Sequence, residues 1–199
     1  MAAESTLQRP SIRLPAEFVL IVVSILSAFG VEEWRDNRGR DQMRTVALSN
    51  IRTEVEHNIA AIEAVMPYHG EVATTIMQAV ASQTDWGGRR AIEVGVELAP
   101  NGILAPDLRT TAWETAQATG AVALLEYSLS ESIAGVYGLQ SMGVAATLKR
   151  MVDNVFTLST FRANDTEAVL MLIGSLAGEL YAQERELRSR LERLLEELP

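Results

Sequence analysis

One stretch near the N-terminus limits what this chain can fold into more than any other feature. The 14 residues from Phe18 to Val31 contain no charged side chain and consist mostly of Val, Ile, Leu and Phe. With its flanks the apolar segment covers 14–34, and 21 residues at about 1.5 Å per residue span roughly 30 Å, the thickness of a bilayer core. The sequence therefore predicts a transmembrane helix over 14–34, preceded by an N-terminal tail over 1–13.

The flanks of this segment fit the two interfaces of a membrane. Trp34 suits the headgroup region, and Arg13 and Arg35 would extend their guanidinium groups toward water. Two other interpretations stay open. A cleaved signal peptide would use the small residues Ala28 and Gly30 as its cleavage site, and a short apolar run also suits a buried core helix.

The net charge of the chain lies beyond this segment. Residues 1–45 carry six acidic and six basic side chains, so the formal net charge of −9 belongs to 46–199. An acidic domain makes nucleic acid a poor partner. The chain has no cysteine, which excludes disulfides, thiol catalysis and Cys-ligated metal centres.

Apolar residues recur three and four positions apart in the acidic domain over 46–199, which predicts helices. The helix of the span would continue through a juxtamembrane portion over 35–45 and run on to about Met66. Pro67 would end it, because the proline ring disfavours the helical conformation of the preceding residue. A second helix is expected over 70–82.

Residues 91–98 alternate between apolar and polar side chains, which predicts an extended segment or a small hairpin with 102–104. Three further helices are expected, ending near 118, 161 and 198. Their start signals are Thr111-Ala-Trp-Glu114, Ser128-Leu-Ser-Glu131 and Asn164-Asp-Thr-Glu167. The expected fold is mainly α: an N-terminal transmembrane helix that continues into an extramembrane helical bundle with one irregular or small β segment.

The last expected helix carries a heptad repeat. One core position is leucine in each heptad, and the other is occupied by Ala177, Glu184 and two leucines. This stripe would either mediate self-association or pack within the chain's own domain, since three heptads are the lower limit for a coiled coil. The candidate self-association residues are Leu180, Leu187, Leu191, Leu194 and Leu198.

Candidate chemistry is sparse. Glu54 and His57 lie three residues apart on one helix face, the spacing of a di-iron ligand pair, but His69 has no Glu three residues before it. We therefore expect no metal, no cofactor and no catalytic residues. Trp113 and Glu114, at the start of a capped helix, would either line a ligand pocket or anchor the core.

Two stretches resemble an uncharacterised family of bacterial single-span inner-membrane proteins with a helical extramembrane domain. The run from Glu17 to Arg35, which ends in Trp and a charged residue, is similar to the family's span, although Ser24 stands where glycine is usual. The stretch from Ala105 to Gly120 is similar to its middle region. The resemblance implies a periplasmic domain, whereas the arginines after the span favour a cytoplasmic one.

These patterns predict a membrane-anchored helical interaction or scaffold protein, an accessory subunit of a larger membrane complex. Its partners would be the lipid bilayer and either other membrane-protein subunits or a second copy. The alternative is a membrane-anchored sensory or small-ligand-binding helical domain, which needs a partly polar pocket between helices.

Overall fold

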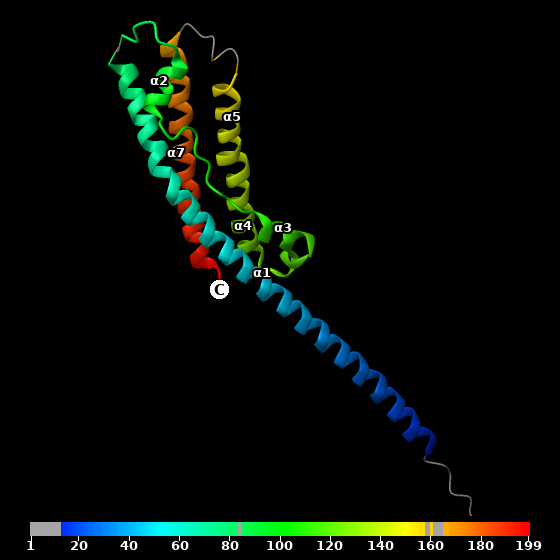
Figure 1. Cartoon of the computed structure of the whole chain (residues 1–199). Helices are drawn as coiled ribbons and strands as arrows, with labels where there is room; N and C mark the ends of the chain where they lie inside the picture. The colour runs from blue at the N-terminus through cyan, green and yellow to red at the C-terminus, as the bar shows by residue number, and fades with distance from the viewer. Residues whose placement is uncertain (1–12, 83–84, 158–159, 161–164) are drawn as a thin grey trace, which may run out of the picture. The chain divides into compact units, whose positions relative to one another are not determined.

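The computed structural model describes residues 13–82, 85–157, 160 and 165–199, with side chains from Phe18 onward. The chain divides into two compact units, Met1–Met43 and Arg44–Pro199 (Figure 1). Every regular element of the described ranges is a helix. The mainly α expectation is therefore confirmed, and no β segment is present in these ranges.

The first unit contains the beginning of helix α1, which covers Arg13–Ala81. Its large apolar side chains between Phe18 and Trp34 are exposed. Among the residues with described side chains, no helix is long and apolar enough to cross a membrane. The span predicted over 14–34 is not supported there, because charged Glu32 and Glu33 follow the apolar run and 14–17 lie outside the described side chains.

Helix α1 continues through Pro67, so the predicted end at Met66 and the separate helix over 70–82 are wrong. A proline inside a helix removes one backbone hydrogen bond and its ring opposes the preceding turn. Burial on both sides of the proline outweighs this cost, since Ile62 and Ile76 are completely buried.

Residues 91–98 form helix α2 (Ala91–Leu98), so the predicted strand is wrong. Ala91 lies three residues before Val94, which is helical spacing, and these two residues are the ones buried in α2. The extended part of the chain follows α2 instead and leads to α3 (Thr111–Ala118).

Beyond α3 the predicted helix starts are close to the observed ones. After a short turn, η1 (Ala121–Leu124), the chain enters one long helical run with a π-helical segment in its middle. Asp165 caps the last helix by accepting a 3.0 Å hydrogen bond from the Ala168 N–H. The remaining elements are α4 (Tyr127–Leu139), η2 (Gln140–Ala145), α5 (Ala146–Val155) and α7 (Thr166–Glu197). Helix α5 ends at Val155, earlier than the predicted end near 161, which itself lies outside the described residues.

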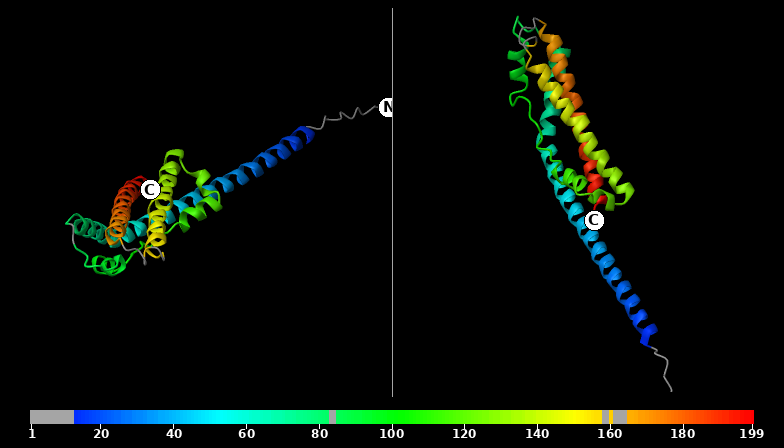
Figure 2. Two further views of the ribbon diagram at one scale, coloured as in Figure 1. Left: turned by 90° about the horizontal axis from the view of Figure 1, so that it is seen from above. Right: turned by 90° about the vertical axis from the view of Figure 1, so that its right-hand side faces the viewer.

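The second unit is a bundle of three long helical elements: the later part of α1, the α4–η2–α5 run and α7 (Figures 1 and 2). Helices α1 and α7 run antiparallel, because Arg52 contacts the end of α7 whereas Ile76 lies beside Gly174. The Arg52 guanidinium donates to the carbonyl groups of Leu195, Leu198 and Pro199 and so caps the C-terminus of α7.

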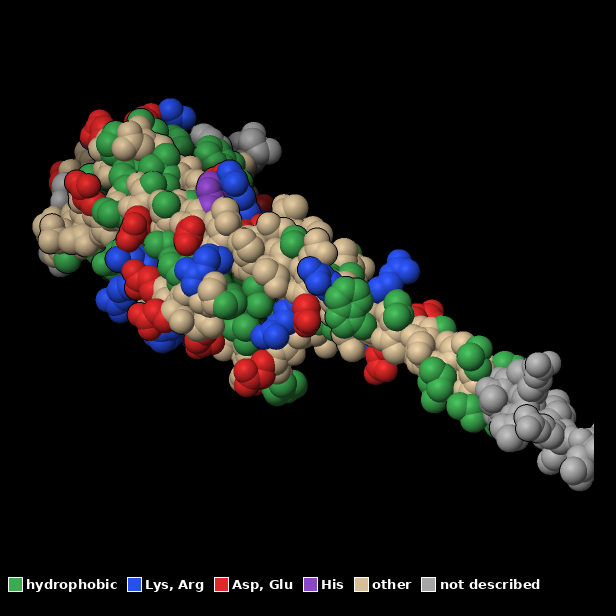
Figure 3. Space-filling model, turned by 90° about the horizontal axis from the view of Figure 1, so that it is seen from below, with side chains coloured by type: hydrophobic (Ala, Val, Ile, Leu, Met, Phe, Trp, Pro, Cys, Tyr) green, Lys and Arg blue, Asp and Glu red, His purple; other side chains and the backbone are tan. Residues whose placement is uncertain are grey.

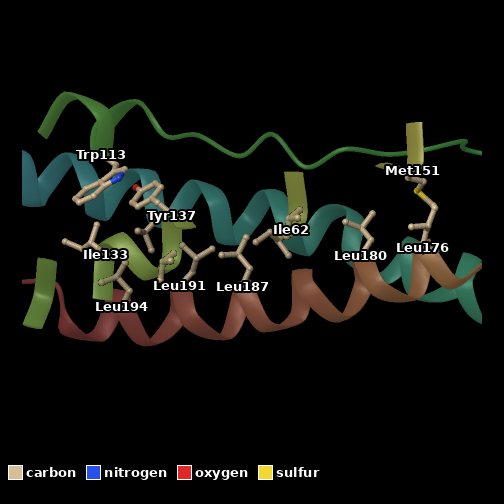
Figure 4. Packing of buried hydrophobic residues seen from close by; sticks show 14 of the residues in the cluster. Ile62, Trp113, Ile133, Tyr137, Met151, Leu176, Leu180, Leu187, Leu191 and Leu194 are labelled. Carbon is tan, nitrogen blue, oxygen red and sulfur yellow. The ribbon is translucent and has the colours of Figure 1, made fainter. Parts of the chain in front are cut away.

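The heptad leucines of α7 point into this bundle (Figure 4). They are buried in the chain's own core, so the leucine stripe packs within its own domain, which was the alternative to self-association. The side chains in question are Leu180, Leu187, Leu191, Leu194 and Leu198.

Helix α7 packs tightly against α1 at Gly174. A Cβ atom at Gly174 would lie 2.9 Å from the Ile76 Cγ2 and 3.1 Å from the Met77 Sδ. One turn further on, a Cβ at Gly178 would lie 3.9 Å from the Ala73 Cβ, an ordinary contact. A methyl group would therefore clash with α1 at Gly174 but fit without a clash at Gly178.

We expect Gly174→Ala to lower the free energy of unfolding by about 1 kcal/mol, because overpacking outweighs the gain in helix propensity. Gly178→Ala is the matched control and should raise it by up to about 1 kcal/mol. Urea denaturation followed by circular dichroism measures both. Equal stability of the two variants would contradict the close approach of α1 and α7.

Candidate functional site

One face of α1 carries the polar side chains that hold the extended part of the chain. We call residues 99–110, between α2 and α3, the connecting segment. Figure 4 shows it passing along α1 without a strand partner. Several backbone groups of this segment are partly buried and need hydrogen-bond partners, which α1 provides with side chains. These side chains belong to His57, Asn58, Tyr68 and His69, while Glu54 on the same face binds the start of α3.

Glu54 holds the start of α3. Its carboxylate accepts hydrogen bonds from the N–H groups of Ala112 (2.8 Å) and Trp113 (3.3 Å). It also accepts a 2.6 Å hydrogen bond from the Tyr137 hydroxyl, and burial together with this carboxylate raises the pKa of Tyr137. Glu54 therefore caps α3 from a different helix, where a negative charge also favours the helix dipole.

Asn58 pairs with the backbone of Arg109 as a neighbouring strand would. Its Nδ2 donates to the Arg109 carbonyl (2.9 Å), and the Arg109 N–H donates to its Oδ1 (2.8 Å). Gln140, the first residue of the π-helical η2, donates to the same carbonyl at 3.0 Å. The preceding residue, His57, has its Nε2 3.0 Å from the Asp107 carbonyl oxygen and 3.2 Å from the Asp107 carboxylate.

Tyr68 and His69 hold the other end of the connecting segment. The Tyr68 hydroxyl donates to the Gly102 carbonyl (3.0 Å) and accepts from the Asn101 N–H (3.2 Å), and burial raises the pKa of Tyr68. His69 Nε2 donates to the Leu104 carbonyl at 3.0 Å. The far ends of the segment are thus fixed to the same helix face.

His69 also joins the segment to α7. Its Nδ1 lies 2.8 Å and 3.0 Å from the two carboxylate oxygens of Glu184, and both side chains are almost completely buried. A carbonyl oxygen only accepts, so Nε2 carries a proton and a second proton is shared between Nδ1 and Glu184. Neither ring nitrogen is free to bind a metal or to take a proton from a substrate.

An apolar cavity of about 130 Å³ lies beside His69. Its wall consists of residues from α1, α2, the connecting segment, α5 and α7. Leu104 and Glu184 engage the polar atoms of His69, so the imidazole presents no unpaired nitrogen to this cavity. The bundle therefore contains an apolar cavity next to a closed polar network.

Glu54 and His57, which have the spacing of a di-iron ligand pair, have separate partners in the structure. Glu54 is engaged by α3 and Tyr137, and His57 is engaged by Asp107. The described ranges contain no group of three His, Asp or Glu side chains that could hold a metal ion.

The two candidate pocket residues, Trp113 and Glu114, have different surroundings. Trp113 is buried and stacks on Tyr137, with 5.6 Å between ring centroids and an angle of 7° (Figure 4). Glu114 is exposed and accepts a 2.7 Å hydrogen bond from the Thr110 hydroxyl. Trp113 is a core anchor, and the apolar cavity is lined by other residues.

Of the predicted membrane-interface residues, Trp34 and Arg35 are exposed. The Arg38 guanidinium lies 5.5 Å from the centroid of the Trp34 ring, a cation–π contact. The side chain of Arg13 lies outside the described residues.

The sequence analysis did not find the pairing of His69 with Glu184. One signal was present, since Glu184 occupies a core position of the leucine heptad and a carboxylate there needs a buried partner. The partner is 115 residues away, and no spacing rule connects the two.

No family model, no curated protein and no solved structure matches this chain.

We expect His69→Ala to lower the free energy of unfolding by about 3 kcal/mol, because it leaves the buried Glu184 carboxylate and the partly buried Leu104 carbonyl without their partner. His57→Ala is the matched control, since the His57–Asp107 pair is exposed, and should cost less than about 1 kcal/mol. Urea denaturation of the two variants provides the comparison. Similar losses would show that the buried pair does not fix the connecting segment.

Proposed function

We propose that this chain is a membrane-anchored helical interaction protein, with its anchor in 14–34, a juxtamembrane helix over 35–45 and the Arg44–Pro199 unit as its extramembrane domain. The observation that carries the proposal is the uncovered apolar surface of α1. The large side chains on it are exposed on every face, with Phe18 at 68%, Ile21 at 56% and Leu26 at 64%. A helix that is apolar all round needs a covering, either a protein core or a bilayer.

A bilayer covering follows from the length and the ends of the segment. The uncharged run of 14 residues covers roughly 21 Å, so the proposal needs the residues before Phe18, including Leu14 and Ala16, to complete the span. At the other end Trp34 and Arg38 form a cation–π pair, an arrangement that suits the headgroup region. Glu17 would then lie at the opposite interface.

The interaction role is supported by the surface of the α4–η2–α5 run. Residues 132–148 contain no charged side chain, in a chain where 22% of residues are charged. Within this stretch the Met142 side chain is 79% exposed. Elsewhere acidic and basic side chains are intermixed on the surface, as the face in Figure 3 shows. An uncharged surface of this kind favours contact with another protein subunit.

On the basis of the resemblance noted above, we propose the bacterial inner membrane as the location and the periplasmic side for the domain. No catalytic role is part of the proposal.

Two arginines in the apolar run should release the chain from the membrane. Each costs about 3 kcal/mol at the centre of a span, so Val23→Arg with Leu26→Arg removes most of the insertion free energy. The matched control is Met43→Arg with Val46→Arg, two exposed positions of the same helix outside the run. Membranes from cells that express each full chain are washed with alkaline carbonate, and the protein is quantified in pellet and wash.

We expect the unmodified chain and the control in the pellet and the doubly substituted chain in the wash. An unmodified chain that is washed off would contradict the anchor. The pellet fraction is then dissolved in mild detergent, sized by light scattering and analysed by mass spectrometry. The proposal expects a defined complex with a second membrane subunit, and a lone monomer would contradict the interaction role.

A further inference from the structure

The cavity beside His69 is closed to polar occupants. Its lining is almost entirely apolar, and the polar side chains in its wall already have partners. The Tyr68 hydroxyl is engaged by Gly102 and Asn101, and His69 by Leu104 and Glu184. The Thr160 hydroxyl donates to the Asn154 carbonyl at 2.6 Å. A buried water needs two to four polar partners, so this space does not favour water.

The volume and the lining residues of the cavity determine the size and chemistry of a molecule that it can hold. At about 130 Å³ the cavity approaches the size of an apolar cavity that stays dry and binds benzene in another protein. Tyr68 and Phe156 contribute aromatic rings, and Met151 contributes a thioether, which makes favourable contacts with aromatic rings. Val96 and Phe156 line the cavity and are each 62% exposed, so the space reaches the surface between α2 and the end of α5.

Gly95 keeps part of this space open. It lines the cavity in the middle of α2, and a Cβ atom built on it meets no atom within 4 Å. A glycine inside a helix costs about 1 kcal/mol relative to alanine, so neither packing nor helix stability accounts for a glycine here.

We propose that this cavity is a binding site for a small apolar molecule of monocyclic-aromatic size, such as toluene. The molecule enters between Val96 and Phe156 and lies against Met151 and the Tyr68 ring. Its binding uses the Arg44–Pro199 unit alone and goes beyond the interaction role proposed above.

The test uses the full chain with ¹³C-labelled methionine methyl groups, reconstituted in lipid nanodiscs, and toluene as the probe. Met151 is buried in the cavity wall, whereas Met142 is exposed and outside it. We expect a saturable chemical-shift change of the Met151 methyl with a Kd on the order of 1 mM, and no saturable change at Met142. Partitioning of toluene into lipid gives a linear response and is thereby separated from binding.

Gly95→Leu fills the cavity with a better helix former and should weaken toluene binding at least tenfold. The matched control is Gly135→Leu, a second helical glycine with free space around it that is not among the cavity residues, and it should bind as the unmodified chain does. Phenol, which has nearly the same shape, should bind the unmodified chain at least tenfold more weakly because its hydroxyl finds no free partner.

The phenol comparison does not depend on how Gly95→Leu folds. Absence of a saturable Met151 shift, equal binding by Gly95→Leu, or equal affinity for phenol and toluene would each overturn the proposal. If α1 does not insert, the chain does not enter the nanodiscs, and the same titration without lipid still tests the cavity because the reporter methyl lies in the bundle.

Discussion

The hydrogen bonds from one face of α1 to the connecting segment are the constraint on which the rest of the bundle depends. Residues 99–110 run beside a helix and not beside a strand, so their backbone groups cannot be paired by a sheet. The α1 side chains at 57 and 58 pair one half, and those at 68 and 69 pair the other, about three helical turns away. Glu54 on the same face holds the start of α3 that follows the segment. An α1 face made only of apolar residues would leave the partly buried groups of Leu104 and Arg109 without a protein partner.

Both ends of the segment transmit this constraint to neighbouring elements. At one end Glu54 fixes the start of α3, so that Trp113 stacks on Tyr137 of α4. At the other end His69 links the segment to Glu184 of α7. A polar residue at a heptad core position costs stability but selects one register, because only one alignment of α7 on α1 gives Glu184 its partner. The same end of the segment forms part of the wall of the apolar cavity.

The sequence predicts well what depends on neighbours within a few residues. The start of α7 at a capping aspartate and the leucine stripe of that helix follow from local spacing. The continuation of α1 through Pro67 could not be predicted, because the outcome depends on burial of Ile62 and Ile76 against other helices. For 91–98 the alternation over eight residues is compatible with either a strand or a helix, and packing decides. The candidate site depends on pairs 50 to 115 residues apart, such as His57 with Asp107 and His69 with Glu184, for which a single sequence contains no signal.

Amide hydrogen exchange tests this account most directly. The N–H groups of Arg109, Ala112 and Trp113 donate to α1 side chains, so they should exchange within about tenfold of the rate of core α1 amides such as that of Ile62. Asn58→Ala should remove the protection of Arg109 while that of Ile62 is retained. Exchange of Arg109 and Ala112 in the unmodified chain at the rate of an unstructured peptide would contradict the central role of the α1 polar face.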